Sequence, residues 1–128
     1  MSTADLSSYN PATVPDAAGM RFGIVVSDWN SQVTWKLLEG AVATLRKHGV
    51  ENNDIIIKHV PGSFELTLGA QFIAEYEDTD GVICLGCVIQ GETAHFTYIC
   101  QSVTQGITQL NLEYNIPFIF GVLTTDTL

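Results

Sequence analysis

The segment Val88–His95 (VIQGETAH) combines residue types that can bind an anion with one that can transfer a proton. Gly91 permits a tight turn and a close approach of the backbone to a ligand. The amides of Glu92 and Thr93 are expected to begin a helix, whose unpaired N–H groups and partial positive charge suit a phosphate. The Glu92 carboxylate has the wrong charge for that task and would have to point away. A glycine before a helix is by itself a weak signal for a phosphate site.

His95 is expected in the first turn of the same helix, where its imidazole could exchange a proton near neutral pH. A structural histidine with satisfied hydrogen bonds explains this position equally well, so position alone leaves both interpretations open. His48 precedes Gly49 at the end of another expected helix, and His59 lies in an expected strand. Neither of these two histidines points to catalysis.

Two aromatic residues, Trp29 and Phe64, each follow an apolar run closely. Large aromatic side chains belong more often to the core than to a binding site. Their positions at the ends of two adjacent expected strands favour the alternative, in which they stack on a planar ligand ring. Glu65 opens a helix, where a carboxylate is favourable in any case, and could accept hydrogen bonds from a polyol.

Cys84 and Cys87 have the C-x-x-C spacing of redox and zinc sites. They lie in one expected strand, where residues three apart point to opposite faces, so they can neither pair nor share a metal. Together with Cys100 they make an odd count without a signal peptide, which indicates free thiols in a reducing compartment. No Walker A, G-x-G-x-x-G or Ser–His–Asp pattern is present. We therefore expect no metal.

The elements that must position these residues alternate regularly along the chain. The four apolar runs are continuous, as in strands that are buried on both faces. Right-handed crossovers then predict a doubly wound parallel α/β sheet, with ligands at the carboxyl ends of the strands. The expected strands are Arg21–Ser27, Asp54–Val60, Gly81–Cys87 and Pro117–Leu123, and the expected helices are Ser31–His48, Glu65–Tyr76 and Thr93–Tyr114.

Composition limits the classes of protein that this chain can represent. Its 128 residues suit one domain, which we expect over residues 21–128, after an N-terminal arm over residues 1–20. A net charge of -9 argues against nucleic acid and anionic membranes as partners. No apolar run approaches the roughly 18 residues of a membrane span, and no signal peptide is visible. We expect a cytoplasmic protein.

Charge is also scarce, because only 15% of the residues are charged whereas about 25% is usual. The expected helix Thr93–Tyr114 carries His95 and Glu113 but otherwise shows uncharged polar residues. This helix either meets another subunit or has a merely polar exposed face. The chain ends soon after the fourth expected strand, where Thr and Asp residues could cap a further helix. We expect a C-terminal part, including that helix, to be absent.

Three segments together resemble the lumazine synthase (6,7-dimethyl-8-ribityllumazine synthase) family. They are Val60–Glu65 (VPGSFE), Leu85–Phe96 (LGCVIQGETAHF) and Pro117–Thr125 (PFIFGVLTT), and the resemblance covers roughly residues 15–128. It implies a flavodoxin-like three-layer α/β/α sandwich, with a four-stranded parallel sheet and helices on both faces. It also implies a homo-oligomer, either a pentamer or a sixty-subunit shell, with active sites between neighbouring subunits.

The family condenses 5-amino-6-(D-ribitylamino)uracil with 3,4-dihydroxy-2-butanone 4-phosphate. The products of this transferase reaction of riboflavin biosynthesis are 6,7-dimethyl-8-ribityllumazine, phosphate and water, and no metal or cofactor is used. The resemblance implies small-molecule substrates and names riboflavin synthase as a candidate partner. It assigns proton transfer to His95 and binding of the butanone phosphate to the amides of Glu92 and Thr93. It assigns the ribitylaminouracil to Trp29, Ser63, Phe64, Glu65, Cys87, Val88, Ile89 and, from the adjacent subunit, Phe120.

One departure from the family leaves alternatives open. Family members continue past Thr125 with a helix that carries a phosphate-binding arginine, then a lysine-bearing loop and a final helix. The chain is thus expected to be the enzyme, a truncated and catalytically impaired oligomerising scaffold, or an unrelated flavodoxin-like binder of a phosphate-bearing ligand.

Overall fold

The computed structural model describes residues 8–92 and 94–127 of the chain. Its four strands form one sheet in the order β2-β1-β3-β4, and all three pairings are parallel. The strands are β1 (Phe22–Ser27), β2 (Ile55–Val60), β3 (Gly81–Ile89) and β4 (Phe118–Thr125), and the helices are α1 (Ser31–Lys47), α2 (Leu66–Tyr76) and α3 (His95–Tyr114).

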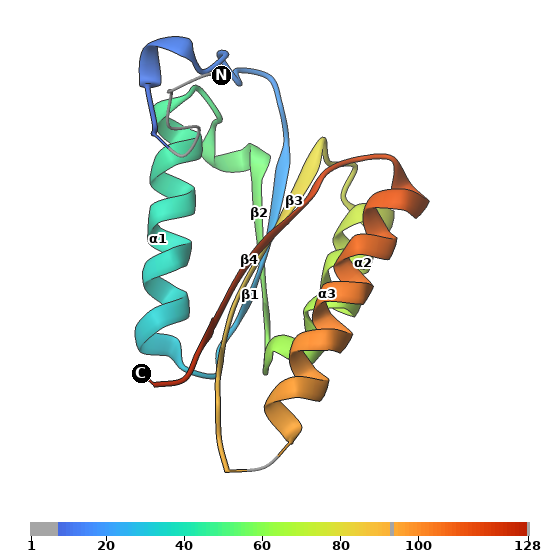
Figure 1. Cartoon of the computed structure of the whole chain (residues 1–128). Helices are drawn as coiled ribbons and strands as arrows, with labels where there is room; N and C mark the ends of the chain where they lie inside the picture. Colours follow the sequence, from blue (N-terminus) through green and yellow to red (C-terminus); the bar gives the residue numbers. More distant parts are fainter. Residues whose placement is uncertain (1–7, 93, 128) are drawn as a thin grey trace, which may run out of the picture.

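The sheet is the middle of three layers, with α1 on one face and α2 and α3 side by side on the other (Figure 1). Alternation along β1 explains how one strand serves both cores. Ile24 and Val26 pack under α1 together with Leu85 of β3, whereas Val25 packs with α2 and α3. Ile24, Val25 and Val26 are fully buried. The predicted α/β sandwich with a parallel sheet and helices on both faces is therefore confirmed.

Each helix contributes a stripe of apolar side chains at helical spacing. In α2 the buried residues are Leu66, Ala70 and Ile73. In α3 they are Val103, Ile107 and Leu110, which join the same core. In both helices the buried residues recur every three or four positions, so one face of each helix packs against the sheet.

Several boundaries differ from those expected. The strand β3 continues two residues past Cys87, and β4 continues to Thr125, because Val88 pairs with Thr124 and Ile89 with Thr125. Thr124 and Thr125 are therefore strand residues. The helix α3 begins at His95 rather than at residue 93, which lies outside the described residues. Cross-strand pairing decides these ends, and local sequence patterns do not encode it.

Residues 8–20 lie against the carboxyl end of α1. They include a 3-10 helix, Pro11–Thr13. The backbone N–H of Ala17 donates to the His48 carbonyl over 2.7 Å, and the Tyr9 hydroxyl is hydrogen-bonded to His48 Nε2. The described part of the expected arm thus contacts its own chain, while residues 1–7 lie outside the described residues.

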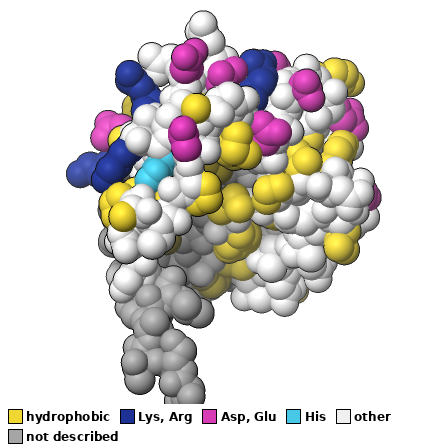
Figure 2. Space-filling model, turned by 90° about the horizontal axis from the view of Figure 1, so that it is seen from above, with side chains coloured by type: hydrophobic (Ala, Val, Ile, Leu, Met, Phe, Trp, Pro, Cys, Tyr) yellow, Lys and Arg dark blue, Asp and Glu magenta, His cyan; other side chains and the backbone are white. Residues whose placement is uncertain are grey.

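One strip of the sheet carries apolar side chains that remain accessible. Ile119 and Leu123 of β4 are 51% and 44% exposed. They lie on the same face of the sheet as α1. Seen along the strands, hydrophobic side chains gather in a hollow, and most of the charged side chains in view lie to one side of it (Figure 2). No helix within residues 8–92 and 94–127 is long and apolar enough to cross a membrane.

Candidate active site

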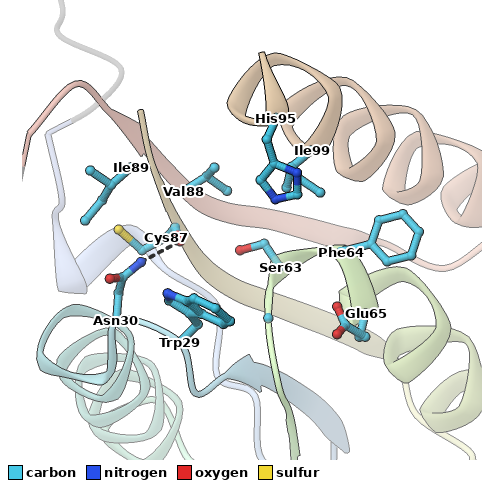
Figure 3. A pocket seen from close by; sticks show the side chains of 11 residues that line it. Trp29, Asn30, Ser63, Phe64, Glu65, Cys87, Val88, Ile89, His95 and Ile99 are labelled. Carbon is cyan, nitrogen blue, oxygen red and sulfur yellow. Dashed lines mark hydrogen bonds between the residues drawn. The ribbon is translucent and has the colours of Figure 1, made fainter. Parts of the chain in front are cut away.

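A pocket of about 590 Å³ opens where strands β1, β2 and β3 end (Figure 3). Because the strands are parallel, their carboxyl ends meet at one edge of the sheet and bring distant loops together. The pocket is lined by Trp29, Asn30, Gly62, Ser63, Phe64, Glu65, Cys87, Val88, Ile89, His95 and Ile99.

The loop that bears Trp29 continues the ladder between β1 and β2. The backbone N–H of Asp28 donates to the Val60 carbonyl and that of Trp29 to the Pro61 carbonyl, both over 2.9 Å. Asn30 then precedes α1 with a left-handed φ of 63°, a conformation that asparagine tolerates better than most residues. Its side-chain amide donates to the carbonyl of Cys87 on β3 over 3.3 Å. The indole of Trp29 is 73% exposed and lies at the cavity.

Ser63 and Phe64 belong to a 3-10 helix, Ser63–Glu65, that follows β2 and precedes α2. Phe64 is 60% exposed, whereas Ser63 is buried in the floor of the pocket. The hydroxyls of Ser63 and Ser27 have no hydrogen-bond partner among the described residues. A buried hydroxyl without a partner costs about 1–3 kcal/mol. The unpartnered hydroxyl of Ser63 belongs to a residue that lines the pocket.

The end of β3 contributes Cys87, Val88 and Ile89 to the lining. Cys84 and Cys87 lie three residues apart in this strand, hence on opposite faces, and both are free thiols. Burial raises the pKa of the Cys84 thiol to about 12 and also raises the pKa of Cys87. Both thiols are neutral near pH 7, so neither is an activated nucleophile.

His95 is the first residue of α3, and its imidazole reaches the cavity from the side opposite Trp29 (Figure 3). Ile99 stands one helical turn further along and completes this side of the pocket. The cavity thus brings an aromatic surface and a proton-transfer group to the same space. Its described lining contains no Lys or Arg, and Glu65 is its one carboxylate.

Eight of the eleven site residues expected from the sequence line this pocket. Glu92 is exposed in the bend between β3 and α3 and is not part of the lining. Thr93 lies outside the described residues. Phe120 of β4 pairs with Cys84, several residues before the end of β3, and is 45% exposed. Its expected contact belongs to a neighbouring subunit, so its absence from this lining leaves that prediction open.

Three lining residues were missed by the sequence reasoning: Asn30, Gly62 and Ile99. Gly62 and Asn30 adjoin residues that were singled out, and this adjacency was the available signal. Ile99 had a helical signal, because it follows His95 by four residues and shares its face of α3. The fit of its side chain into the cavity depends on how α3 packs against the sheet.

Comparison with known proteins agrees with this geometry. A profile of the 6,7-dimethyl-8-ribityllumazine synthase family matches residues 19–128. A protein of that name from Parabacteroides distasonis is 60% identical over 130 residues, which cover 100% of this chain and 81% of the relative. Others from Cytophaga hutchinsonii and Porphyromonas gingivalis are 56% and 52% identical, over 98% and 100% of this chain and 80% and 81% of their own lengths.

These similarities extend across all the segments that line the pocket. They exclude the third expectation, an unrelated binder of a phosphate-bearing ligand, and they favour the enzyme over an impaired scaffold. The chain therefore belongs to the 6,7-dimethyl-8-ribityllumazine synthase family, the transferases that act in riboflavin biosynthesis.

Proposed function

We propose that this chain condenses 5-amino-6-(D-ribitylamino)uracil with 3,4-dihydroxy-2-butanone 4-phosphate in the pocket at the ends of β1, β2 and β3. The observation that supports this site is the convergence of Trp29, Phe64 and His95 on one cavity of about 590 Å³. The three residues come from three separate segments of the chain. A cavity of this size suits a small polar molecule with one planar ring.

The pyrimidine ring is proposed to stack on Trp29, whose exposed indole offers a flat apolar surface. Phe64 would contact the ring or the first carbons of the ribityl chain. The hydroxyl of Ser63 and the carboxylate of Glu65 would hydrogen-bond the polar groups of this substrate, and the backbone of Cys87, Val88 and Ile89 would offer further partners. These assignments draw on the exposure of the aromatic rings and on the buried, unpartnered hydroxyl of Ser63.

His95 is the proposed proton-transfer residue. The substrate amine attacks the ketone and water leaves to form an imine; phosphate is then eliminated, and the resulting enol carbonyl compound cyclises with loss of a second water. Each of these steps moves a proton, and a positioned imidazole contributes about 10²–10⁴-fold to such reactions. Much of the remaining acceleration is expected from holding the two substrates together, which can supply about 7–11 kcal/mol in favourable cases.

The phosphate of the second substrate is proposed to bind at the amino end of α3, through the backbone amides of residues 92 and 93. His95 begins this helix beside the cavity. The aligned peptide dipoles of a 20-residue helix give its first turn a partial positive charge. The lining described for the pocket includes no cationic side chain apart from His95 when it is protonated. Backbone amides are therefore the proposed phosphate donors.

We also propose that the protein assembles as a homo-oligomer, a pentamer or a sixty-subunit shell, in which Phe120 closes the pocket of a neighbouring copy. Exposed apolar side chains on β4 and α3 support this assembly, with Ile119 at 51%, Phe120 at 45% and Leu112 at 76% exposure. The cytoplasm is the proposed location, since the three free cysteines suit a reducing compartment. Riboflavin synthase is the proposed partner that would receive the product.

Two titrations test the proposed reaction. The first adds ribitylaminouracil alone and follows binding by Trp fluorescence; the second adds butanone phosphate and follows the lumazine absorbance. Binding and product formation are expected, with the Parabacteroides distasonis relative as positive control. Binding without product would favour the impaired scaffold, and no binding at all would refute the proposed site.

A further inference from the structure

A cluster of three side chains stands beside the pocket and takes no part in its lining. The carboxylate oxygen Oδ1 of Asp28 accepts a hydrogen bond from His59 Nδ1 over 2.7 Å and another from Trp35 Nε1 over 3.1 Å. His59 belongs to β2 and Trp35 to α1, while Asp28 follows β1 directly. One carboxylate thus ties three elements together at the residue before Trp29.

Burial in the core does not hold these three side chains together. Trp35 is 50% exposed, and the side chains of His59 and Asp28 are 45% and 47% exposed. The rings of Trp35 and His59 meet edge to face, with their centroids 6.4 Å apart. The hydrogen bond from His59, followed by that from Trp35, lowers the pKa of Asp28, so the carboxylate that accepts both bonds is ionised at neutral pH. Specific polar contacts hold these exposed side chains together.

The neighbours of Trp29 are fixed on both sides. Before it, Asp28 is held by the cluster and by its backbone bond to Val60; after it, Asn30 is held by the carbonyl of Cys87. The indole itself is 73% exposed and gains little orientation from packing. Its direction therefore depends on the backbone that carries it, and that backbone is anchored to β2, α1 and β3.

We propose that Asp28 and His59 are positioning residues, which hold the loop between β1 and α1 so that the indole of Trp29 faces the cavity before substrate arrives. The inference rests on the proposed stacking role of Trp29. A ring that is already oriented loses less conformational freedom when the pyrimidine binds, and this loss otherwise weakens affinity. Neither residue lines the pocket, so their effect acts through Trp29.

The first test measures substrate binding and steady-state kinetics in Asp28→Ala and His59→Leu. Both changes are expected to raise the Kd for ribitylaminouracil about 3- to 10-fold, the range for one newly mobile side chain. The KM for butanone phosphate and kcat at saturating pyrimidine are expected to stay within about twofold. A merely structural role would instead lower activity in proportion to the folded fraction, leaving the Kd of the folded protein unchanged.

Two matched variants serve as controls. His59→Asn places an amide N–H near the position of Nδ1 and is expected to restore the wild-type Kd. Glu39→Ala removes an exposed carboxylate from α1, outside the cluster, and is expected to leave the Kd unchanged. If Asp28→Ala does not fold, the pair His59→Leu and His59→Asn still decides the question.

A second readout works without substrate. The chain has two tryptophans, so Trp35→Phe leaves Trp29 as the one indole that fluoresces. Adding Asp28→Ala to that variant is expected to lower the fluorescence anisotropy of Trp29 and to increase its quenching by acrylamide. Unchanged anisotropy and quenching, together with an unchanged Kd in His59→Leu, would overturn the inference.

The two proposals fail in distinguishable ways. If the wild-type protein does not bind ribitylaminouracil, the proposed function is wrong, and the fluorescence of Trp29 still tests its positioning. If Trp29→Ala weakens binding while Asp28→Ala and His59→Leu bind like wild type, the proposed function stands and the positioning inference is wrong.

Discussion

The hydroxyl of Ser63 lies directly over Gly86, where an added Cβ would come within 2.7 Å of Ser63 Oγ. Gly86 sits in the middle of β3, and Ser63 begins the 3-10 helix at the pocket floor. Because glycine has no side chain, Gly86 leaves room for Ser63 at the bottom of the pocket. The position of Ser63 therefore depends on a glycine at residue 86. The same added Cβ would also lie 2.9 Å from Leu66, in the core beneath α2.

Gly86→Ala is expected to destabilise the protein by about 1–3 kcal/mol, since overpacking forces neighbouring atoms to move. It is also expected to weaken pyrimidine binding by displacing Ser63. Denaturant unfolding and fluorescence titration measure the two effects. Gly40→Ala is the matched control. Gly40 lies in the helix α1, and a Cβ added there meets no atom within 4 Å. This substitution is expected to stabilise the protein by up to about 1 kcal/mol. Equal stabilities for the two variants would contradict the tight contact.

His95→Gln is expected to lower kcat about 10²-fold or more, because glutamine can hydrogen-bond but cannot transfer a proton near neutral pH. The Kd for ribitylaminouracil, measured by fluorescence titration without the second substrate, is expected to change little. An equal loss of turnover and of binding would refute the proton-transfer role, because it would indicate that His95 only helps to hold the pyrimidine.

Trp29→Ala is expected to weaken pyrimidine binding by about 1–3 kcal/mol, the range for removing one aromatic ring from a stack with a base. Trp29→Phe retains an aromatic surface and is expected to recover most of the affinity. Isothermal calorimetry measures both, without depending on tryptophan fluorescence. Similar affinities for the alanine and phenylalanine variants would show that the ring does not stack on the substrate.

The buried thiol of Cys84 is expected to make the folded protein less stable at alkaline pH. Burial raises the pKa of its thiol from 9.0 to about 12, so above about pH 9 the unfolded chain releases this proton while the folded protein keeps it. Stability then falls with rising pH by up to about 1.4 kcal/mol per unit until the folded thiol also ionises. Unfolding free energies at about pH 8 and about pH 10 should differ by about 1 kcal/mol more in wild type than in Cys84→Ala. A pH dependence that is identical in both proteins would contradict the buried, neutral thiol.

Local patterns were sufficient for the elements but not for all of their ends. Ile24, Val25 and Val26 are apolar without alternation because both faces of β1 are covered, and this rule predicted a parallel sheet. The carboxyl ends of β3 and β4 were not predicted correctly, because Ile89 and Thr125 become strand residues only by pairing with each other. A hydrophobic pattern within one segment carries no information about such a partner.

For the site, the sequence by itself determined which loops would meet: parallel strands place Trp29, Phe64 and His95 at one edge of the sheet. Tertiary structure alone decided how they meet. Asn30 reaches Cys87, 57 residues further along the chain, and Asp28 reaches His59, 31 residues further. Neither contact follows from periodicity, because the partners are brought together by packing of separate elements whose angles and offsets depend on every side chain between them.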